Sequence, residues 1–188
     1  MRHTSNESAS TPTELPSRTM MTIEPAAEDR MGEHLRIVPY SANHRDAMID
    51  VVQRVYQEYG FTWEADGYHR DLYTVEDYYL RGGGMFWIAL DADRVVGCVG
   101  VTLHGTECEL HRLYLLPEYR GRRLGRRLLE TAMDHGRQSG INRMIAWSDV
   151  KLPDAHKLYL KLGFTQQGQR ICDDPDKALE YGFWKEPL

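Results

Sequence analysis

The sequence contains no long apolar run and few cysteines. No stretch of the 188 residues approaches the ~20 apolar residues that a membrane-spanning helix needs. The N-terminus lacks the apolar core of a signal peptide. The three cysteines, Cys98, Cys108 and Cys172, form no C-x-x-C pair. This odd number predicts free thiols in a reducing compartment. We therefore expect a cytoplasmic protein without a membrane span.

Several metal- and nucleotide-binding patterns are also missing. The eight histidines show no H-E-x-x-H spacing, so we predict no metal site. Neither the dinucleotide pattern G-x-G-x-x-G nor the phosphate loop G-x-x-x-x-G-K-[ST] occurs. Five arginines fall between positions 120 and 127, but the net charge is −5 and no other basic stripe contains interleaved aromatic residues. Nucleic acid is therefore not the expected partner.

The composition predicts one globular domain with a tail. Hydrophobic residues make up 41% of the chain and charged residues 27%, which suits a single domain with a real core. Residues 1–33 are instead rich in Ser, Thr, Pro and Glu. Such a segment buries too little apolar surface to offset its chain entropy. We expect a disordered extension over 1–33 and a folded domain over 34–188, and an alternative start at Met20, Met21 or Met31 is left open.

Hydrophobic periodicity predicts alternating strands and helices. Period-two or apolar runs indicate strands over 35–40, 85–90, 95–101, 107–116, 144–147, from 164 onward, and 179–184. Helical spacing indicates helices ending at Tyr59 and Leu162, a helix starting near Leu124, and a short helix from about Thr74. With an antiparallel start and one crossover helix in the middle, the expected fold class is α+β, or α/β, around a single sheet.

The segment from Arg120 to Gly125 carries the strongest functional signal. It follows the apolar run 113–117 and opens the predicted helix at Leu124. A strand, a glycine-containing turn and a helix N-terminus together form a site for a pyrophosphate, because free N–H groups and the helix dipole point at the anion. Gly121 and Gly125 allow close approach of the backbone. The competing interpretation is an ordinary surface turn with a basic helix start.

Two separated segments resemble the GNAT superfamily of acetyl-CoA-dependent N-acetyltransferases. Residues 113–125 resemble the acyl-CoA signature [QR]-x-x-G-x-[GA], and residues 155–164 resemble the helix end A-x-x-L-Y-x-K-x-G-F. Over residues 35–188 the resemblance implies a mixed, mostly antiparallel sheet of six to seven strands flanked by about four helices. It also implies direct transfer of acetyl from acetyl-CoA to a primary amine of a small molecule or peptide. No metal is implied, and a homodimer is left open.

The resemblance assigns the acetyl-CoA contacts to one loop and its preceding strand. Backbone groups near Leu115 and Leu116 would hold the pantetheine arm as an added strand does. The pyrophosphate would lie on Arg120, Gly121, Arg122, Arg123, Leu124 and Gly125. Arg123 replaces the signature's middle glycine, and we expect it in the first right-handed helical turn, where an arginine is not strained. Leu152 stands where many members carry an asparagine that contacts the arm.

Three residues are candidates for the chemistry. Attack requires a neutral amine, and an alkylamine has a pKa of about 10.4, so a base is useful. The resemblance places Glu109 as that base, acting through water, and Tyr159 as the acid that protonates the leaving thiolate. His111, two residues after Glu109 and so on the same strand face, would relay the proton or contact substrate. Each has a structural alternative: an exposed glutamate, a packed histidine and a core tyrosine.

The acceptor residues are predicted less sharply. The resemblance places the aromatic and acidic segment 56–68 beside the acceptor groove, with Tyr59 and Trp63 as the candidates together with His111. Acidic and aromatic side chains suit a cationic amine. Further polar residues that follow the last matched strand or lie near the C-terminus are candidates for the same groove: Asp149, Arg170, Asp173, Asp174 and Glu180.

Two other functions compete with direct acetyl transfer. A cysteine-dependent acyl transferase would use Cys108 with His111, but these residues differ in strand parity, which argues against a thiol–imidazole pair. The second alternative is a module that binds acetyl-CoA as a sensor or interaction partner without transferring acetyl. The presence of Tyr159 and Glu109 argues mildly against it. The identity of the amine is not encoded in any motif of the sequence.

Overall fold

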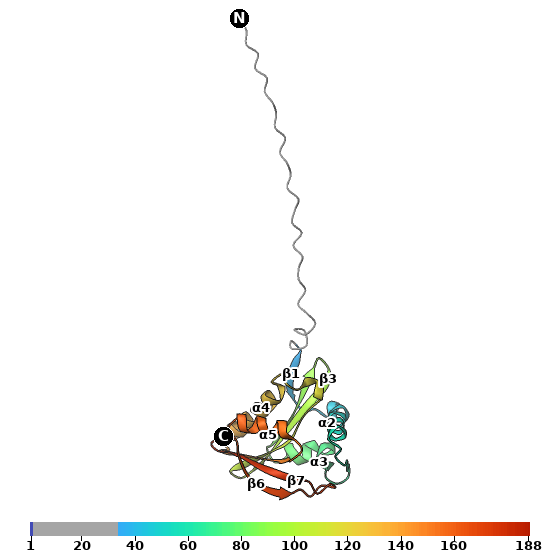
Figure 1. Cartoon of the computed structure of the whole chain (residues 1–188), viewed down its shortest axis with the longest axis vertical. Helices are drawn as coiled ribbons and strands as arrows, with labels where there is room; N and C mark the ends of the chain where they lie inside the picture. Colours follow the sequence, from blue (N-terminus) through green and yellow to red (C-terminus); the bar gives the residue numbers. More distant parts are fainter. Residues whose placement is uncertain (2–33) are drawn as a thin grey trace.

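The computed structural model describes residue 1 and residues 34–188 (Figure 1). The extension expected over residues 1–33 lies, apart from Met1, outside the described residues, so that prediction stays untested. Everything below concerns the domain from residue 34 to the C-terminus.

The described residues form seven strands and four α-helices. The strands are β1 (Leu35–Pro39), β2 (Met85–Asp91), β3 (Arg94–His104), β4 (Glu107–Leu115), β5 (Arg143–Asp149), β6 (Thr165–Ile171) and β7 (Leu179–Lys185). The helices are α2 (Arg45–Tyr59), α3 (Arg70–Tyr73), α4 (Leu124–Gln138) and α5 (Pro153–Lys161). Short 3-10 turns cover Ala42–His44 and Pro117–Tyr119, and a π-helical turn covers Glu76–Leu80. The short helix expected from about Thr74 corresponds to the π-helical turn, and α3 precedes it.

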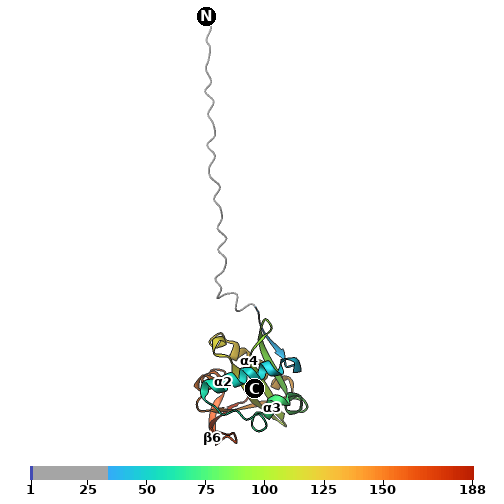
Figure 2. The same cartoon turned by 90° about the vertical axis from the view of Figure 1, so that its right-hand side faces the viewer.

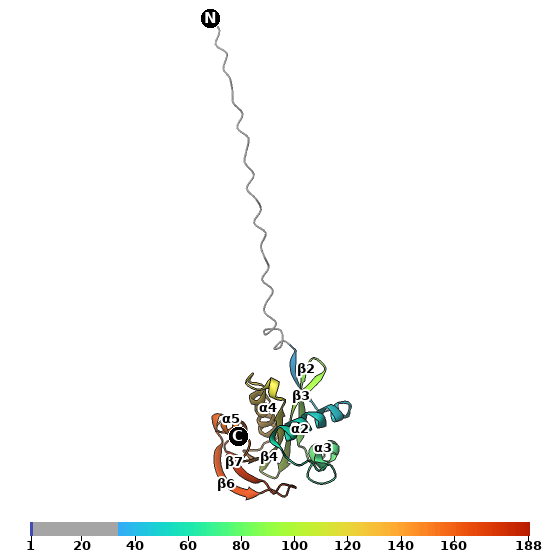
Figure 3. The same ribbon diagram turned by 45° about the vertical axis from the view of Figure 1, so that its right-hand side comes forward.

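All seven strands belong to one sheet with the order β1-β2-β3-β4-β5-β7-β6. Only the β4–β5 pair is parallel, and α4 connects these two strands. The predicted mixed, mostly antiparallel sheet is therefore confirmed. Helices α2 and α3 lie on one side of the sheet and α4 and α5 on the other (Figure 3). Strand β6 is an edge strand and lies at the margin of the domain (Figure 2).

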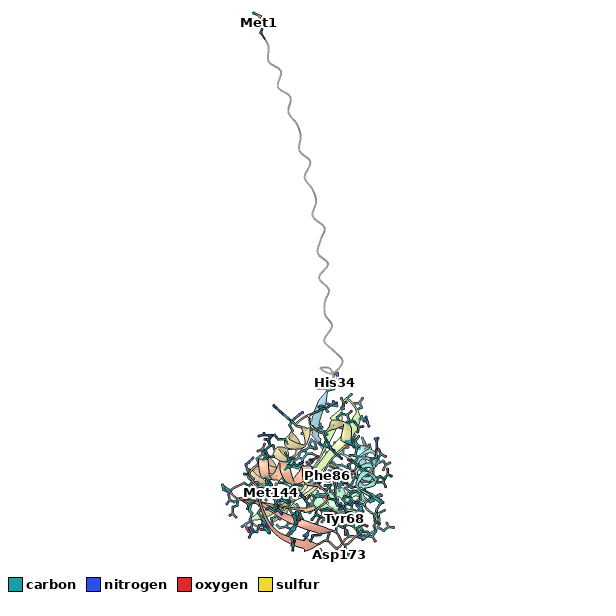
Figure 4. All side chains as sticks on the ribbon, viewed as in Figure 1. Met1, His34, Tyr68, Phe86, Met144 and Asp173 are labelled. Atoms are coloured by element: carbon teal, nitrogen blue, oxygen red, sulfur yellow. The ribbon has the colours of Figure 1, made fainter. Side chains whose placement is uncertain are left out.

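The alternation of side chains along β4 separates a buried apolar face from a polar one. Cys108 and Leu110 are buried, and a Cβ placed on Gly136 of α4 would lie 3.2 Å from the sulfur of Cys108, so these residues face α4. Glu109 and His111 consequently face the side of α2 and α3. Fully buried side chains such as Phe86 and Met144 fill the interior of the domain (Figure 4).

Strands β4 and β5 pair over only part of their length. Their register runs from Glu107–Arg143 to Leu110–Ala146, after which β4 continues without a partner on that side. The N–H of Leu116 donates to the carbonyl of Val96 at 3.0 Å. Because antiparallel pairs alternate, the backbone groups of Leu115 point away from β3 and into this gap. The divergence of the two strands thus opens the sheet where the functional site lies.

A β-bulge changes the direction of β4 next to this gap. The β3–β4 register shifts between Cys98 and Gly100, and Arg112 adopts a positive φ of 52°. The bulge explains why neighbouring side chains, His111 and Arg112, both reach the same cavity. Gly100 allows the close packing on this face, because a Cβ there would lie 2.6 Å from the ring of Tyr79.

Among the helices of the described residues, none is long and apolar enough to cross a membrane. The three cysteines are free and buried.

Candidate active site

Two adjoining cavities lie where β4 and β5 diverge. The first, here the polar cavity, has a volume of about 800 Å³. The second, here the loop cavity, has a volume of about 730 Å³ and is bounded by the segment 120–126. Four residues line both cavities: Leu113, Tyr114, Leu152 and Ala155. Two molecules could therefore meet at this gap, each held by its own set of residues.

The loop cavity combines the end of β4, the start of α4 and one face of α5. Leu115, Leu158 and Lys161 line it together with Arg120, Gly121, Arg123, Gly125 and Arg126. The N–H groups of the first turn of α4 have no partner within the helix. These amides and the surrounding cationic side chains favour an anionic ligand.

The expectation that Arg123 opens a right-handed turn is wrong. Arg123 is the N-cap of α4 and has φ 63° and ψ 3°, which is the left-handed region. The helix begins one residue later, at Leu124, although the N–H of Arg127 still donates to the carbonyl of Arg123 at 3.0 Å. An arginine in this region carries strain that glycine avoids. Arg123, which replaces the glycine of the resembled signature, therefore adopts a backbone conformation that glycine takes without strain.

The two glycines of the loop fit a ligand that lies close to the backbone. Gly121 has a φ of 75°, and no atom lies within 4 Å of a Cβ placed there. A Cβ on Gly125 would lie 3.3 Å from Leu115 and 3.6 Å from Leu158. Any side chain at position 125 would thus occupy the space between β4 and α5, which is the interior of the loop cavity.

Several residues of the predicted loop serve structural contacts. The guanidinium of Arg120 contacts both carboxylate oxygens of Glu58, at 2.6 and 2.7 Å, and donates to the carbonyl of Leu115 at 3.0 Å. It therefore ties the end of α2 to the end of β4. Arg122 lies over the ring of Tyr119 at 5.8 Å from its centroid. The side chains of Leu116 and Leu124 are buried and do not line the cavity.

The polar cavity draws on many elements far apart in sequence. Its lining comes from α2, the 61–78 segment, β4, β5, α5, β6 and β7. Six carboxylates and three guanidinium groups line it: Asp71, Asp77, Glu109, Asp149, Asp174, Glu180, Arg70, Arg112 and Arg170. Negative side chains therefore outnumber positive ones.

Glu109 faces the polar cavity from the centre of β4. Its carboxylate makes no hydrogen bond to any of the described residues. Burial raises the pKa of its carboxyl above the ordinary 4.5, while Arg170 and His104 partly oppose the rise. A carboxylate whose proton affinity is raised in this way is a better proton acceptor than an exposed glutamate.

Tyr159 projects from α5 into the opening between the strands. It is 5% exposed, its ring packs 5.1 Å from that of Phe183, and it lines the polar cavity. Burial, followed by the proximity of Tyr114 and Glu180, raises the pKa of its hydroxyl above the ordinary value. The phenol therefore keeps its proton at neutral pH, and the core aromatic and proton-donor roles are compatible.

The sequence did not predict the most buried ion pair of the site, which joins Arg112 and Asp71. Arg112 donates to Asp71 from Nη2 at 2.7 Å and from Nε at 3.0 Å, and also to the carbonyl of Tyr68 at 2.7 Å. The hydroxyl of Tyr79 donates to the same carboxylate at 2.5 Å. The available signal was a charged residue, Arg112, within the strand predicted over 107–116, because a charge buried on a strand needs a partner.

The predicted substrate residues are separated by the structure. Tyr59 lines the loop cavity rather than the polar one. Trp63 lines neither cavity, since its ring stacks on that of His69 at 3.9 Å. Neither residue lines the polar cavity, and their contact with the acceptor stays a prediction. Other members of the predicted groove do line the polar cavity: Tyr56, Tyr68, His111, Asp149, Arg170, Asp174 and Glu180.

Cys108 lies on the opposite side of the sheet from the cavities. Its sulfur is fully buried toward α4 and lies 3.6 Å from the carbonyl of Arg143. Burial raises the pKa of this thiol to about 12. A thiol that is both inaccessible and protonated does not serve as a nucleophile.

Comparisons with known proteins agree with this architecture. The acetyltransferase (GNAT) family profile matches residues 52–164. The chain is 35% identical over 127 residues to the uncharacterised N-acetyltransferase YjgM of Escherichia coli, covering 63% of this chain and 74% of that protein. It is 36% identical over 107 residues to the N-acetylaspartate synthetase of Rattus norvegicus, covering 53% of this chain and 34% of that protein.

Solved structures share the fold. An acetyltransferase from Streptococcus agalactiae superposes with a TM-score of 0.74 at 26% identity, covering 82% of this chain and 99% of that one. The PaiA N-acetyltransferase of Thermoplasma acidophilum, solved in complex with coenzyme A, superposes with a TM-score of 0.64 at 20% identity, covering 81% and 98%.

Proposed function

The chain belongs to the acetyltransferase (GNAT) family and is therefore an acyltransferase, and on that premise we propose that it transfers acetyl from acetyl-CoA directly to a primary amine of a small molecule or peptide. The main observation in support is that the two cavities adjoin, with Tyr114 and Ala155 lining both of them. One cavity suits an anionic, elongated ligand and the other a polar acceptor. Direct transfer requires both to be bound together.

Acetyl-CoA would occupy the loop cavity. Its pyrophosphate would contact the first amides of α4 and the cationic side chains of Arg123 and Arg126. Its pantetheine arm would pair with the backbone of Leu115, whose N–H and carbonyl point into the gap. The carbonyl already accepts a hydrogen bond from Arg120, so the arm would share or displace that contact.

Two side chains would assist the reaction. Glu109 would accept a proton from the acceptor ammonium, giving the neutral amine. The amine nitrogen then forms a bond to the thioester carbonyl carbon, and the carbon–sulfur bond breaks. Tyr159 would donate its proton to the departing sulfur and regain a proton from the nitrogen, which loses its second proton as the amide forms. Proximity of the two bound substrates supplies much of the rate. The buried position of Cys108 disfavours an acyl-enzyme route through that residue.

The polar cavity, which would hold the acceptor, has the size of a small-molecule site. Its volume of about 800 Å³ falls within the usual range of such sites. Its excess of carboxylates favours a cationic amine over a dicarboxylic one. The name of the rat relative nevertheless makes aspartate a compound to test. We also propose a cytoplasmic location, which the free thiols support.

An amine panel tests the proposal. Purified protein is incubated with acetyl-CoA and, in turn, monoamines, diamines, aspartate, other amino acids and short peptides, and free CoA is followed with a thiol reagent. We expect release that depends on the amine and a mass increase of one acetyl group on it. Binding of acetyl-CoA by calorimetry without CoA release from any amine would favour the sensor function instead.

A further inference from the structure

Three hydrogen-bonded side chains connect the polar cavity to the protein surface. His111 lines the cavity, and its Nε2 lies 2.9 Å from Oγ1 of Thr102. The same hydroxyl lies 2.8 Å from Nε2 of His104, which is exposed. We propose that this chain carries the proton lost by the acceptor amine from the cavity to bulk water. The proposal rests on the proposed acetyl transfer, which releases one such proton in each turnover.

The sheet brings these three residues together on one face. Thr102 and His104 are two positions apart on β3, so their side chains point the same way. Thr102 pairs across the ladder with Glu109, and His111 is two residues further along β4. Thr102 is 7% exposed, so the hydroxyl in the middle of the chain is shielded from solvent.

A threonine hydroxyl between two imidazoles can pass a proton, because it donates one hydrogen bond while it accepts another. In the tautomers that support transfer, Nε2 of His111 donates to the Thr102 hydroxyl, and that hydroxyl donates to Nε2 of His104. When the proton that Glu109 accepts from the ammonium passes to Nδ1 of His111, the Nε2 proton moves to the hydroxyl oxygen, and the hydroxyl proton moves to His104. The imidazolium of His104 then loses its Nδ1 proton to water. Rotation of the hydroxyl and exchange of the ring tautomers reset the chain.

The entry to the chain is open toward the cavity. Among the described residues, the buried side-chain nitrogen and oxygen atoms without a hydrogen-bond partner are Nδ1 of His44 and Nε2 of His69. Nδ1 of His111 bonds to no described residue and is not one of these buried atoms. Because His111 lines the polar cavity, this nitrogen is accessible to a proton donor there.

The surroundings of His111 favour transfer over storage of the proton. Burial, followed by the charge of Arg112, lowers the pKa of His111 to about 3. Two rings of the π-helical turn, Tyr78 and Tyr79, contact its imidazole. Charged or titratable groups face it from α3, β3, β4 and β6: Asp71, His104, Arg112 and Arg170. A protonated His111 is thus short-lived and loses its proton to the next acceptor. At the outer end, His104 is in contact with solvent.

Replacement of Thr102 tests the central link. Thr102→Val keeps the shape but removes the hydroxyl, whereas Thr102→Ser keeps the hydroxyl. We expect Thr102→Val to lower kcat roughly tenfold, a small share of what acid–base catalysis contributes, with an unchanged KM for acetyl-CoA. Thr102→Ser should retain most of the turnover. Equal losses in both variants, or no loss in Thr102→Val, would overturn the relay.

The exposed end offers a second test that does not disturb the core. His104→Ala should lower kcat, and added imidazole should restore turnover in proportion to its concentration, since it replaces the missing acceptor. A loss that imidazole does not restore would overturn the role of His104. If the unmodified protein releases no CoA with any amine, the proposed function itself fails. If the unmodified protein acetylates an amine and the Thr102→Val variant does so at the same rate, only the relay is refuted.

Discussion

The loop cavity and the polar cavity have almost the same volume but are built differently. The loop cavity takes most of its charged and glycine lining from seven consecutive positions, 120–126. The polar cavity collects its lining from residues as far apart as Tyr56 and Glu180. The loop 120–126 of the first cavity is a local structure that a short motif can encode. The second exists only when distant strands and helices are packed together, so its chemistry can change without altering the motif.

The two cavities also differ in how charge is held. In the loop cavity, Arg126 pairs with Glu130 at 2.8 Å on a largely exposed helix face. In the polar cavity, the side chains of Arg112 and Asp71 are only 9% and 6% exposed. Exposed pairs contribute little to stability, whereas breaking a buried pair leaves an uncompensated charge. Substitutions should therefore affect the two cavities in distinct ways.

The largest effect is expected from Asp71→Asn. Loss of the carboxylate leaves the buried guanidinium of Arg112 unpaired, so the free energy of unfolding should fall by roughly 3–5 kcal/mol. Chemical denaturation measures this change. Asp134→Asn is the matched control, because its pair with Arg137 is exposed and should contribute less than about 1 kcal/mol. Equal effects of the two variants would remove the difference between the cavities.

The same pair should give stability a defined pH dependence. Burial raises the pKa of Asp71, but Arg112 and the hydrogen bonds lower it by more than burial raises it. The pKa in the folded state therefore lies below the ordinary 3.8. The contribution of this depressed pKa is therefore present above pH 3.8 and is lost as the pH falls through the lower folded value. The stability difference between wild type and Asp71→Asn should shrink in that range.

Tyr159→Phe should affect the chemistry at the junction of the cavities and leave the loop cavity intact. We expect kcat to fall roughly hundredfold, because the thiolate loses its proton donor. The Kd for acetyl-CoA, measured by calorimetry, should stay within about twofold. Tyr73→Phe, on the exposed side of α3, serves as the control. Unchanged turnover in Tyr159→Phe would remove the hydroxyl from the mechanism.

Glu109→Gln should have a smaller and pH-dependent effect. We expect a decrease of about tenfold in kcat/KM near neutral pH. The pKa of Glu109 is raised above 4.5 by burial, and the active form is the carboxylate. In the wild type, activity should thus decline as the pH falls through that raised value, and the variant should lose this acidic limb. Glu107→Gln is the control, and a limb that persists in Glu109→Gln would assign the base to another group.

The smallest effect is expected from Arg123→Gly in the loop cavity. Glycine relieves the strain of φ 63°, so the free energy of unfolding should rise by up to about 1 kcal/mol. Loss of the charge should weaken acetyl-CoA binding less than about fivefold. Arg123→Ala removes the same charge but keeps the strain, so it should weaken binding equally without the gain in stability. A destabilised Arg123→Gly would show that the arginine makes contacts that outweigh its strain.

Much of the fold was predictable from local patterns. The strands, the long helices and the start of α4 follow from apolar periodicity and glycine positions, which act over a few residues. The conformation of Arg123 was not predictable in this way, because an arginine normally avoids positive φ. Pairing partners also escaped prediction: nothing local in the sequence links Arg112 to Asp71, which lies 41 residues earlier.

The sequence by itself determined the family and the course of the loop 120–126, since each motif is a contiguous segment whose residues are read directly from the sequence. Only the tertiary structure decided the polar cavity. The divergence of β4 from β5, the bulge at Arg112 and the packing of α5 brought Glu109, His111 and Tyr159 to one opening. Such an arrangement depends on contacts between distant segments, and the free energy of those contacts is absent from any local pattern.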